Sequence, residues 1–509
     1  MNPKPAPPFA KVNRTGKKGI ILLELKLAQS RAVALEADAI VVLEWKGSKQ
    51  PALAKTLSAF YDSGEITGKP LEFTLLHGLE GYKARRVLIA GAGERAKFDA
   101  VMLRKVAGAS MRFLSGKGIS SVAFGLDQDE LSTPEFVEAA AEGALLGAWE
   151  PDRLKTDKKE DSKPIASVTL AVGDANGLDG ALDRGRTIGE AANLTRDIAV
   201  EPPNVLTPMA LADRARKMAE AAGLPIEVLD QDRMRQLGMG ALLGVAQGSA
   251  EPPALIVIRY VPEKSSDPAT HLGFVGKGVT FDTGGISIKP SEGMEKMKYD
   301  MAGAAAVIGA MQAIAHLKPS VAVTGIIPTV ENMPGSKAQR PGDIVKSMSG
   351  KTIEILNTDA EGRLILADAI TYAKQLGCTH LVDTATLTGA IVVALGHLSS
   401  GAFTNNDPLL EKWMAASKQA GEKMWHMPLD DEYRDLLKTV YADIGNIGGR
   451  YGGACTAAMF IKEFVGDTPW VHVDVAGTAW LDDATPYMAK GPTGIPLGSF
   501  VNLALNWIA

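Results

Sequence analysis

Short apolar runs alternate along the chain with longer segments in which apolar residues recur at helical spacing. In the first part of the chain, strands are expected at 39–43, 86–90, 121–125 and 168–172. Helical patterns over 98–114 and 134–146 fill two of the gaps. Buried strands form continuous apolar runs of four to eight residues, whereas amphipathic helices repeat every 3.6 residues. Their alternation favours an α/β layer structure with a largely parallel sheet.

A second unit of the same kind follows a single long helical segment. Residues 178–198 have helical spacing, and Pro202-Pro203 ends the pattern because proline disfavours helix in the residue before it. Thr207-Pro208 then has the form of a helix N-cap followed by proline at the first helical position. Further strands are expected at 254–259, 272–275, 321–327, 353–356, 380–383 and 470–475.

These patterns divide the 509 residues into an N-terminal domain (1–177), a connector helix (178–199) and a C-terminal domain (200–509). The fold class expected is two α/β domains, each with a mostly parallel central sheet flanked by helices, joined by the connector helix. At roughly 150 residues per domain, the length allows this division. Residues 1 to about 18 are expected to be a flexible lead-in, and the charge run 155–163 a solvated loop.

Composition narrows the class of protein without identifying it. Hydrophobic residues make up 46% and charged residues 22% of the chain, as in an ordinary globular protein. The net charge of −5 gives no electrostatic case for a nucleic-acid or membrane partner. The two cysteines, Cys378 and Cys455, form no metal-binding pair and no secreted disulfide framework. The longest weakly polar run, 302–317, is shorter than the ~20 residues that a membrane span needs. Since residues 1–19 also lack the apolar core of a signal peptide, we expect a soluble, cytoplasmic protein.

Charged residues interrupt the apolar pattern most sharply at 357–363, Asn-Thr-Asp-Ala-Glu-Gly-Arg. Asp359, Glu361 and Arg363 occupy alternate positions between the expected strand at 353–356 and a buried helical pattern. Side chains two residues apart lie on one side of an extended segment. Charges in apolar surroundings are costly unless they are paired or bind a metal. On its own, this stretch fits a surface turn with an Asp/Glu–Arg ion pair equally well.

Two other stretches place charged residues beside predicted elements. Lys277, Asp282 and Lys289 lie in a glycine-rich segment after the strand at 272–275, and Asp300 precedes an apolar helix. Ligands of open α/β sheets bind outside the carboxyl ends of the strands. We therefore expect these residues and 357–363 to lie together at that edge of the sheet. Taken one at a time, three of these residues have a structural explanation. Lys277 fits a short Gly-Lys-Gly turn, Lys289 fits a solvated loop lysine, and Asp300 fits an aspartate favoured at a helix start. Their joint occurrence favours a functional site.

Four carboxylates are expected at this edge of the sheet, and they repel one another unless cations offset their charge: Asp282, Asp300, Asp359 and Glu361. Lys277, Lys289 and Arg363 offset part of it. Two divalent metals, about 3.5 to 4 Å apart and bridged by a shared carboxylate, would offset it more completely and would form a hydrolytic centre. The three stretches contain no histidine. Ligands that are mostly carboxylate favour hard ions such as Mn²⁺ or Mg²⁺, although zinc is not excluded.

Two features nearby have more than one interpretation. Met294, Met297 and Met301 fit either an adaptable apolar side-chain pocket or a helical core stripe. The glycine-rich segment 445–453 fits either a mobile loop near a site or a tight packing turn. The seven histidines are scattered, and we interpret them as structural.

Residues 357–364 resemble the signature octapeptide of the leucyl (cytosol) aminopeptidases, the M17 metallopeptidase family. Segments 275–289 and 297–301 match the other two site motifs of that family, in the same order. The resemblance covers 200–509, which would be the catalytic peptidase domain, whereas the N-terminal part matches only in general architecture. It implies a homohexameric metallo-aminopeptidase that hydrolyses the N-terminal residue, preferably leucine or another bulky apolar residue, from peptides with a free N-terminus.

The resemblance also implies the metal ligands. One metal would be held by Asp282, Asp359 and Glu361, with the backbone carbonyl of Asp359 contributing. The other would be held by Lys277, Asp282, Asp300 and Glu361. Asp282 and Glu361 would therefore bridge the two ions, which are expected to be Mn²⁺ or Zn²⁺. A lysine ligand must be deprotonated, which an adjacent dication favours by lowering the lysine pKa.

Two residues would carry the chemistry that the resemblance implies. A hydroxide that bridges the metals would attack the scissile carbonyl, and Lys289 would stabilise the resulting gem-diolate oxyanion. Arg363 would bind a bicarbonate ion that serves as general base. The α-amine of the substrate would ligate the second metal, which would restrict the enzyme to N-terminal residues.

Two other classes of function fit parts of the chain. A two-metal phosphoesterase could use the same carboxylates, but a lysine ligand argues against it. A nucleotide-binding or regulatory module could be built on the N-terminal unit, where residues 91–94 (Gly-Ala-Gly-Glu) follow a strand. This segment lacks the third glycine and the acidic partner of a dinucleotide-binding loop, so we interpret it as a plain turn. Some members of the family bind DNA, but the near-neutral charge argues against a general nucleic-acid role.

Overall fold

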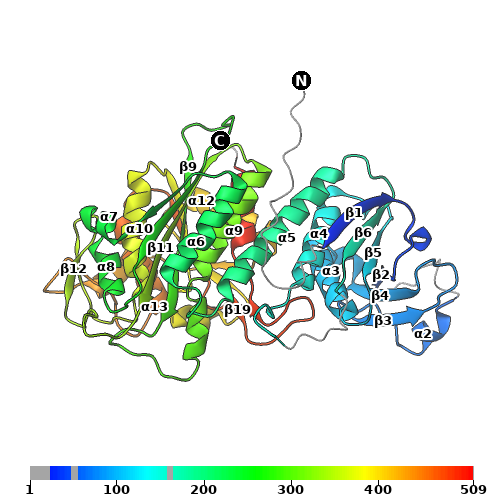
Figure 1. Ribbon diagram of the computed structural model, residues 1–509, viewed down its shortest axis with the longest axis horizontal. Coiled ribbons are helices and arrows are strands. Elements are labelled where there is room, and N and C mark those ends of the chain that lie inside the picture. Colours follow the sequence, from blue (N-terminus) through cyan, green and yellow to red (C-terminus); the bar gives the residue numbers. More distant parts are fainter. Residues whose placement is uncertain (1–22, 48–55, 157–163, 508–509) are drawn as a thin grey trace. The chain divides into compact units, whose positions relative to one another are not determined.

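The computed structural model of the chain describes residues 23–47, 56–156 and 164–507 (Figure 1). The chain folds as two compact units. The N-terminal unit runs to Asn193 and includes Asp482–Gly491, and the C-terminal unit contains Leu194–Leu481 and the residues from Pro492 onward. The expected lead-in at 1–18 and most of the charge run at 155–163 lie outside the described residues.

The N-terminal unit contains a six-stranded sheet in the order β1-β6-β5-β2-β4-β3. Its strands are β1 (Glu24–Gln29), β2 (Ala39–Trp45), β3 (Phe73–His77), β4 (Arg86–Gly93), β5 (Ser121–Leu126) and β6 (Ser167–Val172). All neighbours are parallel except β3 and β4. Helices α3 (Ala100–Leu114) and α4 (Pro134–Ala148) pack against each other. The four strands predicted here are confirmed. The two that the sequence pattern missed, β1 and β3, are the edge strands, and neither has a fully buried residue.

Two helices follow this sheet in the chain. Helix α5 (Asp179–Ala199) coincides with the predicted helical segment, and the division between the two units falls within it. Helix α6 (Pro208–Ala222) begins as predicted, since Thr207 Oγ1 accepts a hydrogen bond from the backbone N–H of Ala210. It ends at Gly223, whose φ of +70° is a left-handed conformation that suits glycine.

The C-terminal unit is built on a nine-stranded sheet in the order β16-β15-β18-β14-β9-β11-β8-β7, with β10 paired to β11. The strands are β7 (Ile226–Leu229), β8 (Ala254–Tyr260), β9 (His271–Gly276), β10 (Gly278–Asp282), β11 (Ala322–Asn332), β14 (His380–Ala385), β15 (Ser400–Thr404), β16 (Met424–His426) and β18 (Trp470–Asp474). The central strands β18, β14, β9 and β11 are parallel to one another. Three neighbouring pairs are antiparallel: β7 with β8, β8 with β11, and β15 with β18. A mostly parallel sheet is therefore confirmed in both units.

Helices cover this sheet in two groups. Helix α9 (Ala302–Leu317) packs against α6 and α14 (Leu497–Leu505), and α14 also packs against α12 (Asp407–Ala420). Helix α10 (Gly362–Gln375) packs against α8 (Gly240–Ala246) and α13 (Gly453–Val465) (Figure 1). Leu364, Ile365 and Ile370 of α10 belong to the core between these helices and the sheet.

One segment of the described residues, Met294–Leu317, is long and apolar enough to cross a membrane. It comprises the 3₁₀ helix η3 (Met294–Tyr299) and α9, and 78% of its most apolar window is buried inside the protein. Such burial is that of a core helix, because a membrane-spanning helix presents apolar side chains to lipid. Met301 is fully buried, in keeping with the core interpretation of this methionine.

The structure corrects the prediction for the segment before residue 357. The strand there is shorter than expected, β13 (Thr352–Glu354), and lies in a separate small sheet with β12 (Ile344–Lys346) and β17 (Ile444–Gly445). The Asn446 side chain accepts the backbone N–H groups of Leu356 and Asn357, so the strand pairing ends before them.

The extended conformation predicted for 357–363 is also wrong. Thr358 and Asp359 form a turn, and α10 begins at Gly362. Asp359 and Glu361 therefore project from a turn and from a helix N-terminus. Their convergence depends on that turn, and the alternation of an extended strand does not explain it.

Candidate functional site

Three parallel strands bring the predicted site residues to one edge of the C-terminal sheet. β11 pairs with β9 through its first half and with β10 through its last residues. Lys277 stands at the junction between β9 and β10, and Asp282 is the last residue of β10. Asp300 lies between η3 and α9, and Glu361 precedes the first residue of α10.

Lys277 is almost fully buried, and acceptors surround its ammonium group. Its Nζ donates to Asp300 Oδ1 at 2.8 Å and to the backbone carbonyl of Thr386 at 3.0 Å. Glu361 Oε1 lies 2.8 Å from the same nitrogen. Burial by itself would lower the pKa of Lys277, but the charges of Asp300 and Glu361 outweigh it and raise this pKa. The Gly-Lys-Gly segment is therefore more than a turn, since its lysine neutralises two carboxylates from different elements.

Lys289 bridges two other carboxylates of the same group. Its Nζ lies 2.8 Å from Asp282 Oδ2 and forms an ion pair with Asp359 Oδ1. Its side chain is 21% exposed, whereas that of Lys277 is 3% exposed. Lys289 is thus on the more open side of the site. It is not the freely solvated loop lysine that its position before Pro290 suggests.

The carboxylates crowd one another closely enough to perturb their ionisation. One ligand oxygen each of Asp282, Asp359 and Glu361 lies within 4.8 Å of the others. Burial and the neighbouring negative charges raise the pKa of Asp282 and raise that of Asp359 to about 6. Burial likewise raises the pKa of Asp300 well above its ordinary value. Burial acts in the same direction on Glu361, but Lys277 and Lys289 outweigh it and hold this pKa below its ordinary value.

The donor set suits divalent metal ions. Asp300 Oδ2, Asp359 Oδ1 and Glu361 Oε1 are buried against lysine ammonium groups. Lys277 Nζ lies 2.8 Å from the oxygens of Asp300 and Glu361, and Lys289 pairs with that of Asp359. Four carboxylates share these two ammonium groups, so the lysines offset only part of the negative charge and further cations would be stabilised there. Asp282, Asp359 and Glu361 form a group of three oxygen ligands that fits one ion. The Lys277 and Lys289 ammonium groups lie between pairs of carboxylates, where bridging cations would also be stabilised.

Arg363 does not form the ion pair that a surface turn would have. It is 7% exposed on α10, and its guanidinium donates to the backbone carbonyl of Asn446 at 2.8 Å. Among the described residues no carboxylate lies within the 4.0 Å of a salt bridge, and its Nε has no hydrogen-bond partner. Burial lowers the Arg363 pKa to about 10, against the opposite effect of Glu361 and Asp474. The ion-pair explanation of 357–363 is therefore wrong.

Several polar residues that the sequence pattern did not single out hold the site together. Thr386 donates its hydroxyl to Asp300 Oδ1 at 2.7 Å. Thr358 donates to the Gly284 carbonyl and accepts from the Ser287 N–H. Asn446 and Asn332 bind the backbone beside Asp359. Asn332 is the last residue of β11, and Thr386 directly follows β14. Their positions at the carboxyl ends of strands were the feature of the sequence that could have indicated a role in the site.

Gly362 of the signature segment has a steric role. A Cβ atom at this position would lie 2.7 Å from Cε and 2.8 Å from Nζ of Lys277. Contacts below 3.0 Å require one of the groups to move. Glycine at 362 therefore lets α10 begin beside the Lys277 side chain.

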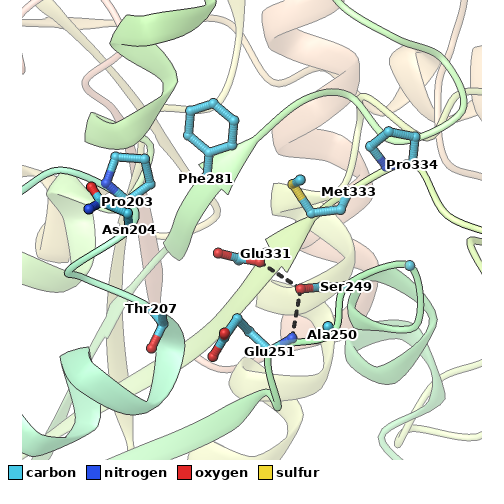
Figure 2. A pocket seen from close by; sticks show the side chains of 11 residues that line it. Pro203, Asn204, Thr207, Ser249, Ala250, Glu251, Phe281, Glu331, Met333 and Pro334 are labelled. Carbon is cyan, nitrogen blue, oxygen red and sulfur yellow. Dashed lines mark hydrogen bonds between the residues drawn. The ribbon is translucent and has the colours of Figure 1, made fainter.

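A cavity of about 430 Å³ lies beside β10 and β11 (Figure 2). Phe281 and Glu331 line it, and they alternate along the two strands with Asp282 and Asn332. Successive side chains of a strand point to opposite faces, so the cavity and the carboxylates lie on opposite faces of this strand pair. Ser249 donates to Glu331 across the cavity and accepts from the Glu251 N–H.

Comparison with protein families gives two matches that together span most of the chain. The model described as "Cytosol aminopeptidase family, catalytic domain" matches residues 193–501. The model described as "Cytosol aminopeptidase family, N-terminal domain" matches residues 46–158. The catalytic match contains every predicted site residue, from Lys277 to Arg363.

Individual relatives are similar over nearly their whole length. A probable cytosol aminopeptidase from Solibacter usitatus is 58% identical over 475 residues, which cover 93% of this chain and 98% of the relative. One from Koribacter versatilis is 48% identical and covers 95% of this chain and 100% of the relative.

Two solved structures have the same fold. The bottromycin maturation enzyme BotP in complex with Mn has a TM-score of 0.83 and 34% identity, covering 92% of this chain and 99% of that chain. A mutant of tomato leucine aminopeptidase has a TM-score of 0.85 and 32% identity, covering 96% of this chain and 97% of that chain.

Proposed function

Since this chain belongs to the cytosol aminopeptidase family and is a metal-dependent aminopeptidase, we propose that it releases leucine or another bulky apolar residue from the N-terminus of peptides. The observation that carries the proposal is the buried group of carboxylates and lysines at the carboxyl ends of β9 and β10. Met294 and Met297 lie in η3, directly before Asp300, and their flexible thioethers suit an adaptable apolar pocket.

In this proposal two divalent ions bind at the carboxylates. Asp282, Asp359 and Glu361, with the Asp359 backbone carbonyl, would hold one ion. The other would be held by Lys277, Asp282, Asp300 and Glu361. The supporting observation is that the four carboxylates outnumber the three cationic side chains, Arg363 included. Ligands that are mostly carboxylate suit Mn²⁺, with Zn²⁺ as the alternative.

Bound ions of this kind lower the pKa of water and polarise the scissile carbonyl. The protein side chains would complete the chemistry. Lys289, on the more open side of the group, would stabilise the negative charge that develops on the carbonyl oxygen of the substrate. Fixed cationic donors of this kind act strongly because they are already oriented when the charge appears.

Arg363 would bind bicarbonate, which would supply the general base. The support is its buried guanidinium, which has no carboxylate partner within 4.0 Å among the described residues and has an Nε without a hydrogen bond. A small planar oxyanion matches the donor geometry of a guanidinium. Bicarbonate fits that description, and it can accept a proton near neutral pH.

The proposal extends to assembly and location. We propose a homohexamer in the cytoplasm. Support for an assembly comes from exposed apolar side chains of the C-terminal unit, among them Val393, Leu398, Val440, Tyr441 and Tyr451. Support for the location is the name of the relatives, cytosol aminopeptidase. Light scattering after size-exclusion chromatography should give about six times the subunit mass of 53.7 kDa, and a monomer would contradict the assembly.

Hydrolysis of leucine p-nitroanilide by Mn²⁺-loaded protein is the primary test. We expect cleavage of this substrate, slower cleavage of the glycine analogue and none of N-acetyl-leucine p-nitroanilide, whose amine is blocked. Glu361→Ala should abolish the reaction, because the variant removes a proposed ligand of both ions. An inactive Mn²⁺-loaded wild type, or a fully active Glu361→Ala variant, would refute the proposed function.

A further inference from the structure

Asn332 is the last residue of β11, and it is buried at the carboxyl end of the sheet. β10 and β11 are parallel and pair Asp282 with Asn332. Paired residues of neighbouring strands direct their side chains to the same face of the sheet, so Asn332 lies beside the carboxylate group. The site motifs do not include this residue.

The amide nitrogen of Asn332 joins two segments that carry proposed metal ligands. Its Nδ2 donates to Asp282 Oδ1 at 2.8 Å and to the backbone carbonyl of Thr358 at 3.0 Å. A carboxylate and a carbonyl only accept hydrogen bonds, so the nitrogen and not the oxygen of the amide must face them. Both N–H groups of the amide are thereby used.

These contacts orient the Asp282 carboxylate. Asp282 Oδ1 accepts from Asn332 and also from the Gly284 N–H at 2.9 Å. With Oδ1 held by two donors, Oδ2 is the oxygen turned toward Lys289, at 2.8 Å. The other contact fixes the carbonyl of Thr358, immediately before Asp359 in the turn that leads to Glu361.

The backbone of Asn332 has a separate structural role. Its carbonyl accepts the N–H of Thr283 at 3.0 Å and the Thr283 hydroxyl at 2.8 Å. Any residue at position 332 can provide this carbonyl. Substitution of the side chain therefore tests the two amide contacts and leaves the pairing of β10 with β11 in place.

We propose that Asn332 is a positioning residue of the metal site, which holds the Asp282 carboxylate and the Thr358–Asp359 turn in the arrangement that the ions require. The inference rests on the proposed function, because Asp282, Asp359 and Glu361 are the ligands proposed there. Without the amide, the Asp282 carboxylate and the Thr358 carbonyl face each other with no donor between them. Groups that hold metal ligands in place typically contribute about 10–100-fold in metal affinity.

The test is Mn²⁺ titration calorimetry on chelator-treated, full-length protein. Asn332→Ala and Asn332→Leu both remove the donors, and Leu keeps most of the side-chain volume. We expect each variant to bind Mn²⁺ about 10–100-fold more weakly than the wild type. Asn502→Ala is the matched control: Asn502 is a buried asparagine of α14 whose Nδ2 donates to the Ala416 carbonyl at 3.3 Å. This control should lose thermal stability and keep the Mn²⁺ affinity of the wild type.

A second measurement separates positioning from a general loss of fold. At saturating Mn²⁺, the Asn332 variants should show a lower kcat with a smaller change in KM, and circular dichroism should report native secondary structure. If one variant does not fold, the other decides the question. Folded variants that bind Mn²⁺ within about twofold of the wild type would overturn the role of Asn332 alone. A wild type that neither binds Mn²⁺ nor cleaves peptides would overturn the proposed function as well.

Discussion

Lys277 and Lys289 neutralise the same group of carboxylates from positions that differ in burial. Lys277 is enclosed by Asp300, Glu361 and the Thr386 carbonyl, whereas the Lys289 side chain is 21% exposed. The enclosed Lys277 nitrogen lies beside two proposed metal ligands, where a bound dication would favour its deprotonated form. A partly exposed ammonium suits contact with a substrate. This difference supports separate roles for the two lysines.

Lys289→Ala should lower kcat by about 10²–10³, since loss of one oxyanion donor typically has an effect of this size. Its metal content should stay at the wild-type value, because removal of an ammonium does not weaken the attraction of carboxylates for a dication. Metal analysis of the purified variant beside its steady-state kinetics checks both expectations. Lys277→Ala is the contrasting variant and should lose metal as well as activity. If metal loss explains the whole defect of Lys289→Ala, the proposed role of Lys289 is wrong.

At the scale of elements, α10 is connected both to the site and to the structure behind it. Glu361, which precedes its first residue, and Arg363 in its first turn lie at the site, and Asp368 lies further along the helix. Asp368 is fully buried and accepts the N–H of Leu242 in α8 at 2.9 Å and that of Met348 at 2.7 Å. This one carboxyl group therefore links α10 to α8 and to the segment that precedes β13.

Asp368 should make the stability of the protein depend on pH. Burial raises its pKa to about 7, above the ordinary value of 3.8, against the opposite effect of the backbone hydrogen bonds. A raised pKa in the folded state means that the contribution of Asp368 to stability is complete below pH ~4 and is lost as pH rises to about 7. The difference in thermal midpoint between wild type and Asp368→Asn should thus become less favourable to the wild type from pH 5 to pH 8. A difference that does not vary with pH would contradict this prediction.

At the scale of the whole molecule, the two units each have their own sheet and core, and every predicted site residue belongs to the C-terminal one. The domain boundaries at 177 and 199 remain proposals. Helix α5 ends at Ala199, at the second of these boundaries, and the division between the two compact units falls inside this helix, after Asn193.

Metal binding should stabilise the folded protein, because unfolding separates ligands that come from distant parts of the chain. A ligand at 100 times its Kd adds about 2.7 kcal/mol to the free energy of unfolding. We expect Mn²⁺ to raise the thermal midpoint and a chelator to reverse the rise, as measured by differential scanning fluorimetry. Glu361→Ala should abolish the response. An equal rise in that variant would indicate binding elsewhere.

The local pattern of apolar and polar residues was sufficient to predict most of the central strands of both sheets. Apolar runs predicted β2, β4, β5, β6, β8, β9, β11, β14 and β18, because strands buried on both faces are continuously apolar. Edge strands such as β1 and β3 escaped this criterion, since none of their residues is fully buried. The N-cap of α6 was also predictable, because a cap depends on neighbours within four residues.

Residue types and their spacing were enough to identify the residues of the candidate site, since the predicted set does converge: Lys277, Asp282, Lys289, Asp300, Asp359 and Glu361. How they converge depends on tertiary structure: a turn replaces the extended conformation expected at 357–363, and Arg363 binds the Asn446 carbonyl in place of a carboxylate. The tertiary structure also places Asn332 between Asp282 and Thr358, which are separated from it by 50 and 26 residues. The reason is physical. Charged residues within an apolar stretch of sequence indicate a functional site, because burial of a charge without a partner is costly. Which donor reaches which acceptor depends on strand register and on the paths of distant segments, and no local pattern encodes these.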